Sequence, residues 1–263
     1  MKRFIPFIKS DPRVAVIRLN GVIASGGRGL NDATLAPIVE KAFRSKPDAV
    51  ALVINSPGGS PVQSSLIGAR IRRLADEKDI PVYAFVEDVA ASGGYWLAAA
   101  ADEIIVDASS VIGSIGVISS GFGLQDFIAK HGVERRVYTA GTSKSQLDPF
   151  KAENPEDIER LKVLLEQIHA TFKEHVQSRR GDKLADADLF NGEIWVGHKG
   201  VEMGLADHVG HLVPFMKEKF GDKVQFRVLS PSRRSLLSRL SMGIVRDAVS
   251  TVEERAAYAQ FGL

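Results

Sequence analysis

A serine lies where a short apolar segment meets a run of helix-forming residues. Residues 81–86 are β-branched and aromatic, Ser92 is followed by two glycines, and Tyr95 begins a run of good helix formers. The glycines let the backbone turn sharply and leave N–H groups free at a helix N-terminus, where negative charge is favoured. Ser92 is therefore a candidate nucleophile beside an oxyanion site, and the alternative is a serine that only caps the helix.

Two further polar stretches could complete such a site. Residues 56–60 read Ser-Pro-Gly-Gly-Ser after an apolar segment, so Gly58 and Gly59 offer backbone N–H groups. Lys144 lies in a loop of hydroxyl and amide residues with no carboxylate before Asp148. A lysine accepts a proton from a hydroxyl only as the neutral amine, and this uncharged neighbourhood suits that role. The alternative for Lys144 is a solvated loop lysine.

Alternating strands and helices are expected to position these stretches. The hydrophobic pattern predicts strands at residues 14–19, 48–54, 81–86, 103–106, 111–118 and 134–139. It predicts helices capped by Asn31, begun by Pro61 and Pro155, and at residues 95–101 and 124–130, then a strand, a short helix and a glycine cap over residues 192–207. Strand-turn-helix units with glycines at the strand ends place both glycine turns on one edge of a parallel sheet.

Composition indicates one main domain with a C-terminal appendage. The chain has 263 residues, of which 44% are hydrophobic and 25% charged, and its net charge of +2 gives no electrostatic case for nucleic acid. The absence of cysteine excludes disulfides and thiolate metal sites. We expect a domain over residues 1–222 and a basic amphipathic helical segment over residues 223–263 that packs in an oligomer or on the core, with binding to a membrane surface as the alternative.

The motifs together resemble the SppA-like family of serine-lysine signal peptide peptidases, over about residues 14–207. The matching pieces are the Asn-Ser-Pro-Gly-Gly stretch, the Ser92 corner, Gly-Ser-Ile-Gly-Val around Ser114, and Lys144 ahead of Pro149 and Phe150. The resemblance implies Ser92 as nucleophile, Lys144 as general base and Ser114 as a hydroxyl partner of the lysine.

The resemblance also implies the rest of the site and the fold. Gly59 and Gly93 would donate to the oxyanion, with Gly58 as the alternative to Gly59. The fold would be α/β of the ClpP/crotonase type, with repeated ββα units around a mostly parallel sheet and a helical C-terminal extension. The family's oligomers assemble active sites from neighbouring subunits, so a homo-oligomer is expected.

The expected activity is hydrolysis of peptides or unfolded protein segments, remnant signal peptides among them, without cofactor or metal. Residues 1–9 are too short for a signal peptide or the family's usual membrane anchor, so we expect a cytoplasmic chain, with peripheral association at the inner membrane left open.

Three alternatives compete with this interpretation. A crotonase-type acyl-CoA enzyme would use the same glycine N–H groups but needs acidic residues for proton transfer. A non-catalytic scaffold would use the basic C-terminal segment instead. The third is histidine chemistry. A Ser-His-Asp triad has weak support, because all six histidines have ordinary interpretations as helix or loop residues. A metal site at His208 and His211 has weak support too, because no acidic cluster completes it apart from Asp207.

Overall fold

The computed structural model describes residues 11–26, 29–141, 143–229 and 255–263. At its centre lies a sheet in the order β6-β5-β3-β2-β1-β8, with β4 paired to β3 and β7 paired to β4. Every pairing is parallel except that of β5 with β6, which confirms the predicted α/β class with a mostly parallel sheet. The strands are β1 (Arg13–Asn20), β2 (Ala49–Ser56), β3 (Val82–Ala91), β4 (Glu103–Val106), β5 (Val111–Gly113), β6 (Ile194–Val196), β7 (His208–Val209) and β8 (Gln225–Leu229).

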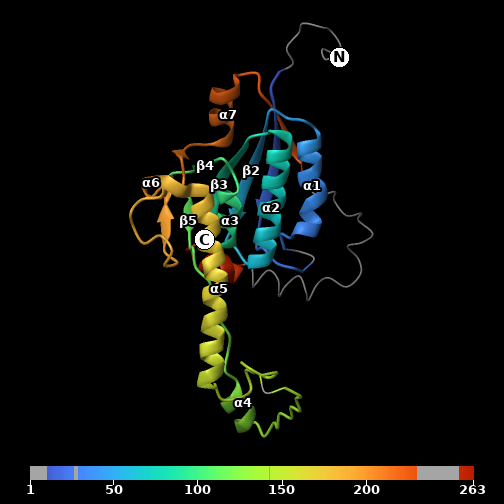
Figure 1. The fold of residues 1–263 in the computed structure, drawn as a ribbon, viewed down its shortest axis with the longest axis vertical. Helices are drawn as coiled ribbons and strands as arrows, with labels where there is room; N and C mark the ends of the chain where they lie inside the picture. Colours follow the sequence, from blue (N-terminus) through green and yellow to red (C-terminus); the bar gives the residue numbers. More distant parts are fainter. Residues whose placement is uncertain (1–10, 27–28, 142, 230–254) are drawn as a thin grey trace.

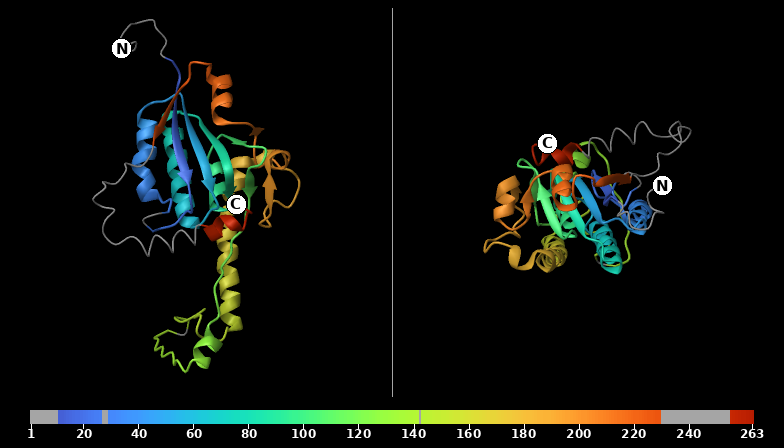
Figure 2. Two further views of the ribbon diagram at one scale, coloured as in Figure 1. Left: turned by 180° about the vertical axis from the view of Figure 1, so that it is seen from behind. Right: turned by 90° about the horizontal axis from the view of Figure 1, so that it is seen from above.

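Helices cover both faces of the sheet (Figures 1 and 2). One face carries α1 (Asp32–Arg44), α2 (Pro61–Lys78), α3 (Gly93–Ala99) and the C-terminal part of α5 (Pro155–Arg180), which together form the larger hydrophobic core. The other face carries α7 (Leu212–Phe220). Further helices in the described ranges are α4 (Gln125–Lys130), the short 3-10 turn η2 (Gly181–Lys183) and α6 (Gly197–Glu202), and residues 255–259 are helical as well.

The pattern of apolar residues explains why the central strands are buried on both sides. In β1, Ala15 and Ile17 join the core under α1 and α2, while Val14 and Val16 join the core under α7. Successive side chains point to opposite faces, so a nearly continuous apolar run fits a strand between two layers of helices.

Three segments differ from the prediction. The strand expected over residues 111–118 ends at Gly113, and residues 114–118 form no strand. Residues 134–139 form no strand, because in the described part of the chain they are mostly exposed and no neighbouring strand accepts their hydrogen bonds. Residues 225–229, expected to begin a helical segment, form β8 and extend the sheet beside β1. Residues 230–254 of the predicted basic segment lie outside the described residues, and the division at residue 222 stays a prediction.

The long helix α5 is only partly embedded in the domain. Its buried residues, Phe172, Val176 and Arg180, all lie near its C-terminal end. The N-terminal half projects beyond the sheet, and α4 with the α4–α5 loop lies at its far end (Figure 1). We call residues 117–168 the arm. No helix in the described ranges has the length and apolar character needed to cross a membrane.

Candidate active site

Ser92 lies at the corner between β3 and α3 in a strained backbone conformation. Its φ of 50° and ψ of −121° fall in a region that serine rarely adopts. Two backbone hydrogen bonds hold it there: Ser92 N donates to Gly113 O at 2.8 Å, and Trp96 N donates to Ser92 O at 3.0 Å. The Ser92 side chain makes no capping hydrogen bond to α3. The alternative of a serine whose hydroxyl caps the helix is therefore wrong.

Backbone N–H groups of two glycines lie beside this serine. Gly59 N is 3.4 Å from the point where a Cβ on Gly93 would stand, so the two glycine segments are in contact. Among the described residues, neither Gly59 N nor Gly93 N donates to a protein acceptor. Gly58 is pressed against the corner, because a Cβ there would come within 2.8 Å of both Ser92 Cβ and Gly93 N. The structure thus brings Ser92, Gly58, Gly59 and Gly93 together, as predicted.

Ser114 follows β5, which pairs with the end of β3. Ala91 and Gly113 are partners in this pairing, so the residues after them, Ser92 and Ser114, emerge at the same edge of the sheet. Ser114 also has a positive φ, 52°, and its N–H donates to Glu193 O at 2.7 Å. Two serines held in unusual backbone conformations therefore lie on neighbouring strand ends.

Lys144 does not join these residues within one chain. It is exposed, and the loop that carries it lies at the far end of the arm from the sheet (Figures 1 and 2). The loop is held to the arm by Leu124 N, which donates to Pro149 O at 2.6 Å, and by an Arg135–Asp148 ion pair at 3.0 Å. The sequence predicts that residues 56–60, Ser92 and Lys144 form one site. Within a single chain the first two come together and Lys144 does not.

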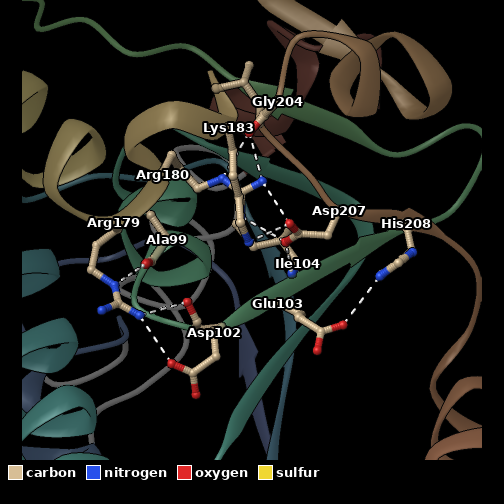
Figure 3. Close-up of polar contacts among 12 residues, drawn as sticks. Ala99, Asp102, Glu103, Ile104, Arg179, Arg180, Lys183, Gly204, Asp207 and His208 are labelled. Carbon is tan, nitrogen blue, oxygen red and sulfur yellow. Dashed lines mark hydrogen bonds and ion pairs between the residues drawn. The ribbon is translucent and has the colours of Figure 1, made fainter. Parts of the chain in front are cut away.

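An ion-pair cluster at the base of α5 was not anticipated from the sequence. Arg180, whose side chain is 2% exposed, contacts Asp207 Oδ2 at 2.8 Å, and Lys183 contacts Asp207 Oδ1 at 2.8 Å (Figure 3). Burial by itself would raise the pKa of Asp207, but hydrogen bonds from Arg180, Lys183 and Ile104 N hold it below its ordinary value. A signal was present: Arg180 follows Phe172 and Val176 at intervals of four, so it occupies a core position of the helix and needs a buried partner.

The same helix end holds α3, the helix that begins at Ser92. Arg179 Nε donates to Ala99 O at 3.1 Å and its Nη2 donates to Ala101 O at 3.0 Å (Figure 3). The ring of His175 stacks on Trp96 with centroids 4.5 Å apart. Burial lowers the pKa of His175, so the ring is favoured in its neutral form. These contacts fix the position of α3 at its C-terminal end.

The histidines named for a metal site have other partners. His208 Nε2 lies 3.3 Å from Glu103 Oε2, and His211 Nε2 lies 3.5 Å from Asp107 Oδ2. Within the described ranges, no group of three or more histidine and carboxylate side chains is placed to hold a metal ion.

The chemistry available at this edge of the sheet is that of acyl transfer. An uncapped serine hydroxyl lies next to two backbone N–H groups that no protein acceptor uses in the described chain. Such a pair of donors is suited to the negative charge that develops when a hydroxyl attacks a carbonyl carbon. The fold and the site together define an α/β protein with a serine-type candidate active site.

Comparison with known proteins agrees with this class. The family model "Peptidase family S49" matches residues 75–219, more than half of the chain. The chain belongs to this peptidase family, which confirms the SppA-like resemblance.

Individual relatives have varied names and lengths. The whole chain is 48% identical over 287 residues to part of "Na(+)/H(+) antiporter NhaA" of Brucella melitensis and covers 39% of that protein. It is 32% identical to "Protease 4" of Haemophilus influenzae, with 75% of this chain and 33% of that protein covered. It is 30% identical to "Serine protease SPPA, chloroplastic" of Arabidopsis thaliana, with 75% and 29% covered. The chain thus spans about two fifths of the first curated relatives it matches.

A solved structure of a mutant "1510-N membrane-bound stomatin-specific protease" aligns with a TM-score of 0.49 and 16% identity. The alignment covers 85% of this chain and 100% of that one.

Proposed function

We propose that the chain is a serine endopeptidase that uses Ser92 as nucleophile and Lys144 as general base. The observation that carries this proposal is the Ser92 corner, where a strained backbone presents an uncapped hydroxyl beside the N–H groups of Gly59 and Gly93. Membership of a peptidase family supports peptides as substrates. The expected substrates are peptides or unfolded segments, including remnant signal peptides.

The proposed reaction follows the general scheme for acyl transfer. The neutral amine of Lys144 takes the proton from Ser92 Oγ as the oxygen attacks the peptide carbonyl carbon. Gly59 N–H and Gly93 N–H donate to the resulting oxyanion, and the lysine then protonates the leaving amine. In the second half of the reaction, Lys144 takes a proton from a water molecule as the water attacks the carbonyl carbon of the acyl-enzyme. The lysine then returns the proton to Ser92 Oγ as the peptide acid leaves. Ser114, on the neighbouring strand end, is proposed to hydrogen-bond the lysine.

We further propose that the lysine at each site comes from a second copy of the chain. The position of the arm supports this, because the α4–α5 loop, which carries Lys144, lies at the far end of the arm from the sheet (Figure 1). The exposed apolar side chains of the arm support it too: Phe122 is 85% exposed and Tyr138 is 91% exposed. Large aromatic side chains in such numbers on a thin projection indicate a surface that another molecule covers.

A complementation experiment tests both parts of the proposal. Ser92→Ala and Lys144→Ala should each be inactive, because nucleophile and base act as a unit. Co-expressed in equal amounts, they should form mixed oligomers in which about a quarter of the sites hold both intact residues, so activity returns to about a quarter of the wild-type rate. The measurement is hydrolysis of a fluorogenic peptide, together with fluorophosphonate labelling of Ser92 located by mass spectrometry.

Two controls make the result decisive. Lys144→Arg should be as inactive as Lys144→Ala, because a guanidinium does not give up its proton at any workable pH. Ser92→Ala co-expressed with the Ser92→Ala/Lys144→Ala double variant should stay inactive. A mixture of the single variants that stays inactive would place both residues of the dyad in one chain, and a Lys144→Ala variant with normal turnover would remove lysine from the mechanism.

The acyl-CoA alternative finds no support in the carboxylates that precede the corner in β3. Glu87 is paired with Arg18 at 3.1 Å, and Asp88 accepts a hydrogen bond from Asn55.

A further inference from the structure

A buried serine contacts the Gly58–Gly59 turn of the candidate oxyanion site. Ser56 is the last residue of β2, and it is fully buried. Its Oγ accepts a hydrogen bond from Gly58 N at 3.2 Å. The N–H of one of the two candidate donor glycines is therefore already used inside the protein.

The next residue, Gly59, is oriented by contacts on its opposite side. Ile23 N donates to Gly58 O at 2.8 Å, and Ser60 N donates to Ile23 O at 2.7 Å. In such a pairing the residue between the two bonded positions turns its own N–H and C=O away from the partner strand. Gly59 N–H therefore points away from Ile23, toward the Gly93 segment.

Ser56 also contacts the segment that carries the other donor. A Cβ on Gly94 would stand 2.3 Å from Ser56 O and 3.2 Å from Ser56 Cβ, so Gly94 packs directly on Ser56. The side chain of Ser56 thus binds the Gly58–Gly59 turn while its backbone supports the start of α3. Ser56 therefore contacts both segments and helps to set the separation of their two N–H groups.

We propose that Ser56 is a positioning residue that makes Gly59, and not Gly58, the oxyanion donor beside Gly93. By binding Gly58 N–H, the Ser56 hydroxyl fixes the turn so that Gly59 N–H faces the reacting carbonyl. This inference rests on the proposed peptidase function and deepens it. It also resolves the choice between Gly58 and Gly59 that the sequence left open.

The test is the Ser56→Ala variant of the full-length chain. Without the hydroxyl the Gly58–Gly59 turn loses its hydrogen bond to Ser56 and is held only by its bonds to Ile23, so Gly59 N–H is less firmly oriented. We therefore expect kcat to fall about 10- to 100-fold, less than the about 10²- to 10³-fold typical of losing a whole oxyanion donor. KM should stay within about twofold, because the interaction is made mainly in the transition state. A peptide aldehyde, whose hemiacetal oxygen occupies the oxyanion position, should lose affinity by a similar factor.

Ser110→Ala is a matched control. Ser110 is also buried, 1% exposed, and its Oγ accepts from a backbone group, Asp107 N, at 2.9 Å. The Ser110 hydroxyl also donates to Val86 O at 3.0 Å, so its loss removes at least as many hydrogen bonds without touching the glycine segments, and kcat should change by less than about threefold. Ser56→Cys, which keeps the shape with a weaker acceptor, should lie between wild type and Ser56→Ala in kcat.

Three results would overturn the inference. One is a Ser56→Ala variant whose kcat falls no more than that of Ser110→Ala, and another is a loss that appears in KM alone. The third is unchanged aldehyde affinity in Ser56→Cys, which decides the matter if Ser56→Ala does not fold. Fluorophosphonate labelling of wild-type Ser92 is measured in parallel: absence of labelling and activity in the wild type would refute the proposed function itself, whereas labelling with no Ser56 effect would refute only this inference.

Discussion

The backbone of Ser92 stores strain that the rest of the corner supports. A non-glycine residue at φ 50° and ψ −121° costs about 1–3 kcal/mol relative to a relaxed conformation. Gly113 O and Trp96 N hold this geometry through the hydrogen bonds to the Ser92 peptide groups. The strain keeps the side chain away from the capping position, where its hydroxyl would be used by the helix.

This strain predicts that two substitutions of Ser92 differ in stability. Ser92→Ala and Ser92→Gly should both be inactive, because each removes the proposed nucleophile. Ser92→Gly should be the more stable of the two by about 0.5–1 kcal/mol, because glycine adopts positive φ without a steric penalty. Urea unfolding followed by circular dichroism gives the comparison. A Ser92→Gly variant clearly less stable than Ser92→Ala would show that the corner is not strained.

Residue types and order sufficed to identify most of the site, but not its assembly. Ser92, Gly59 and Gly93 stand at strand ends that a parallel sheet brings to one edge, so their proximity follows from the fold class. The proposed choice of Gly59 over Gly58 rests on one hydrogen bond from Gly58 N to Ser56 Oγ, which spacing along the sequence does not predict. Lys144 could not be placed from the sequence either, because spacing along the chain does not say whether a loop folds back or projects.

The helix α5 divides into an anchored end and a projecting end. Its apolar residues recur at helical spacing along the whole length, which predicts a buried stripe. In the structure only the C-terminal part is buried, while Val163 and Leu164 remain largely exposed. Periodicity reports which face is apolar, but it does not say whether the same chain or another one covers that face.

The anchored end predicts a pH-dependent contribution to stability. The pKa of Asp207 is lowered in the folded state, so its ion pair stabilises the protein above the unfolded-state value of about 3.9 and is lost as pH falls through the folded-state value. Asp207→Asn leaves the buried Arg180 without its charge partner and should lower the free energy of unfolding by about 3 kcal/mol at pH 7. The difference between variant and wild type should shrink below about pH 4.

The matched control is the exposed pair of Arg73 and Glu77 on α2. These side chains are 2.7 Å apart and about half exposed, so Glu77→Gln should change the free energy of unfolding by less than about 0.5 kcal/mol. Urea titrations at pH 7, 5 and 3 give the values. An Asp207→Asn effect as small as that of Glu77→Gln would contradict the role given to the cluster.

Two strand predictions were wrong because a strand forms only where a neighbouring strand can pair with it, whatever the local propensity of its residues. Residues 134–139 have strand-like composition but lie in the arm, beyond reach of the sheet (Figure 1). Residues 225–229, Gln-Phe-Arg-Val-Leu, fall in the predicted basic helical segment, yet they pair with β1 as an edge strand. An edge strand needs apolar residues on one side only, so its pattern is weak over five residues.

At the scale of the molecule, the described residues form a well-packed α/β domain and an arm that buries little of its own apolar surface. In α4 no residue is buried, and Phe127 on that helix is 61% exposed. The contacts within such a projection bury too little apolar surface to offset the conformational entropy lost when it is ordered. Covering it with a second copy would bury these side chains and bring Lys144 to another chain's Ser92.

This arrangement predicts a homo-oligomer whose contacts depend on the arm. Phe122→Ser combined with Tyr138→Ser removes two of its most exposed aromatic side chains, 85% and 91% exposed, so sedimentation should shift from an oligomer to smaller species at micromolar concentration. The melting temperature of the α/β domain in this variant should be little changed, because neither ring belongs to a core cluster. Peptidase activity should fall with the loss of assembly, since each site would lose its lysine.

As a control, Val62→Ser and Leu66→Ser on α2 remove exposed apolar side chains outside the arm. A wild-type chain that sediments as a monomer, or an arm variant that stays assembled and active, would refute the shared site.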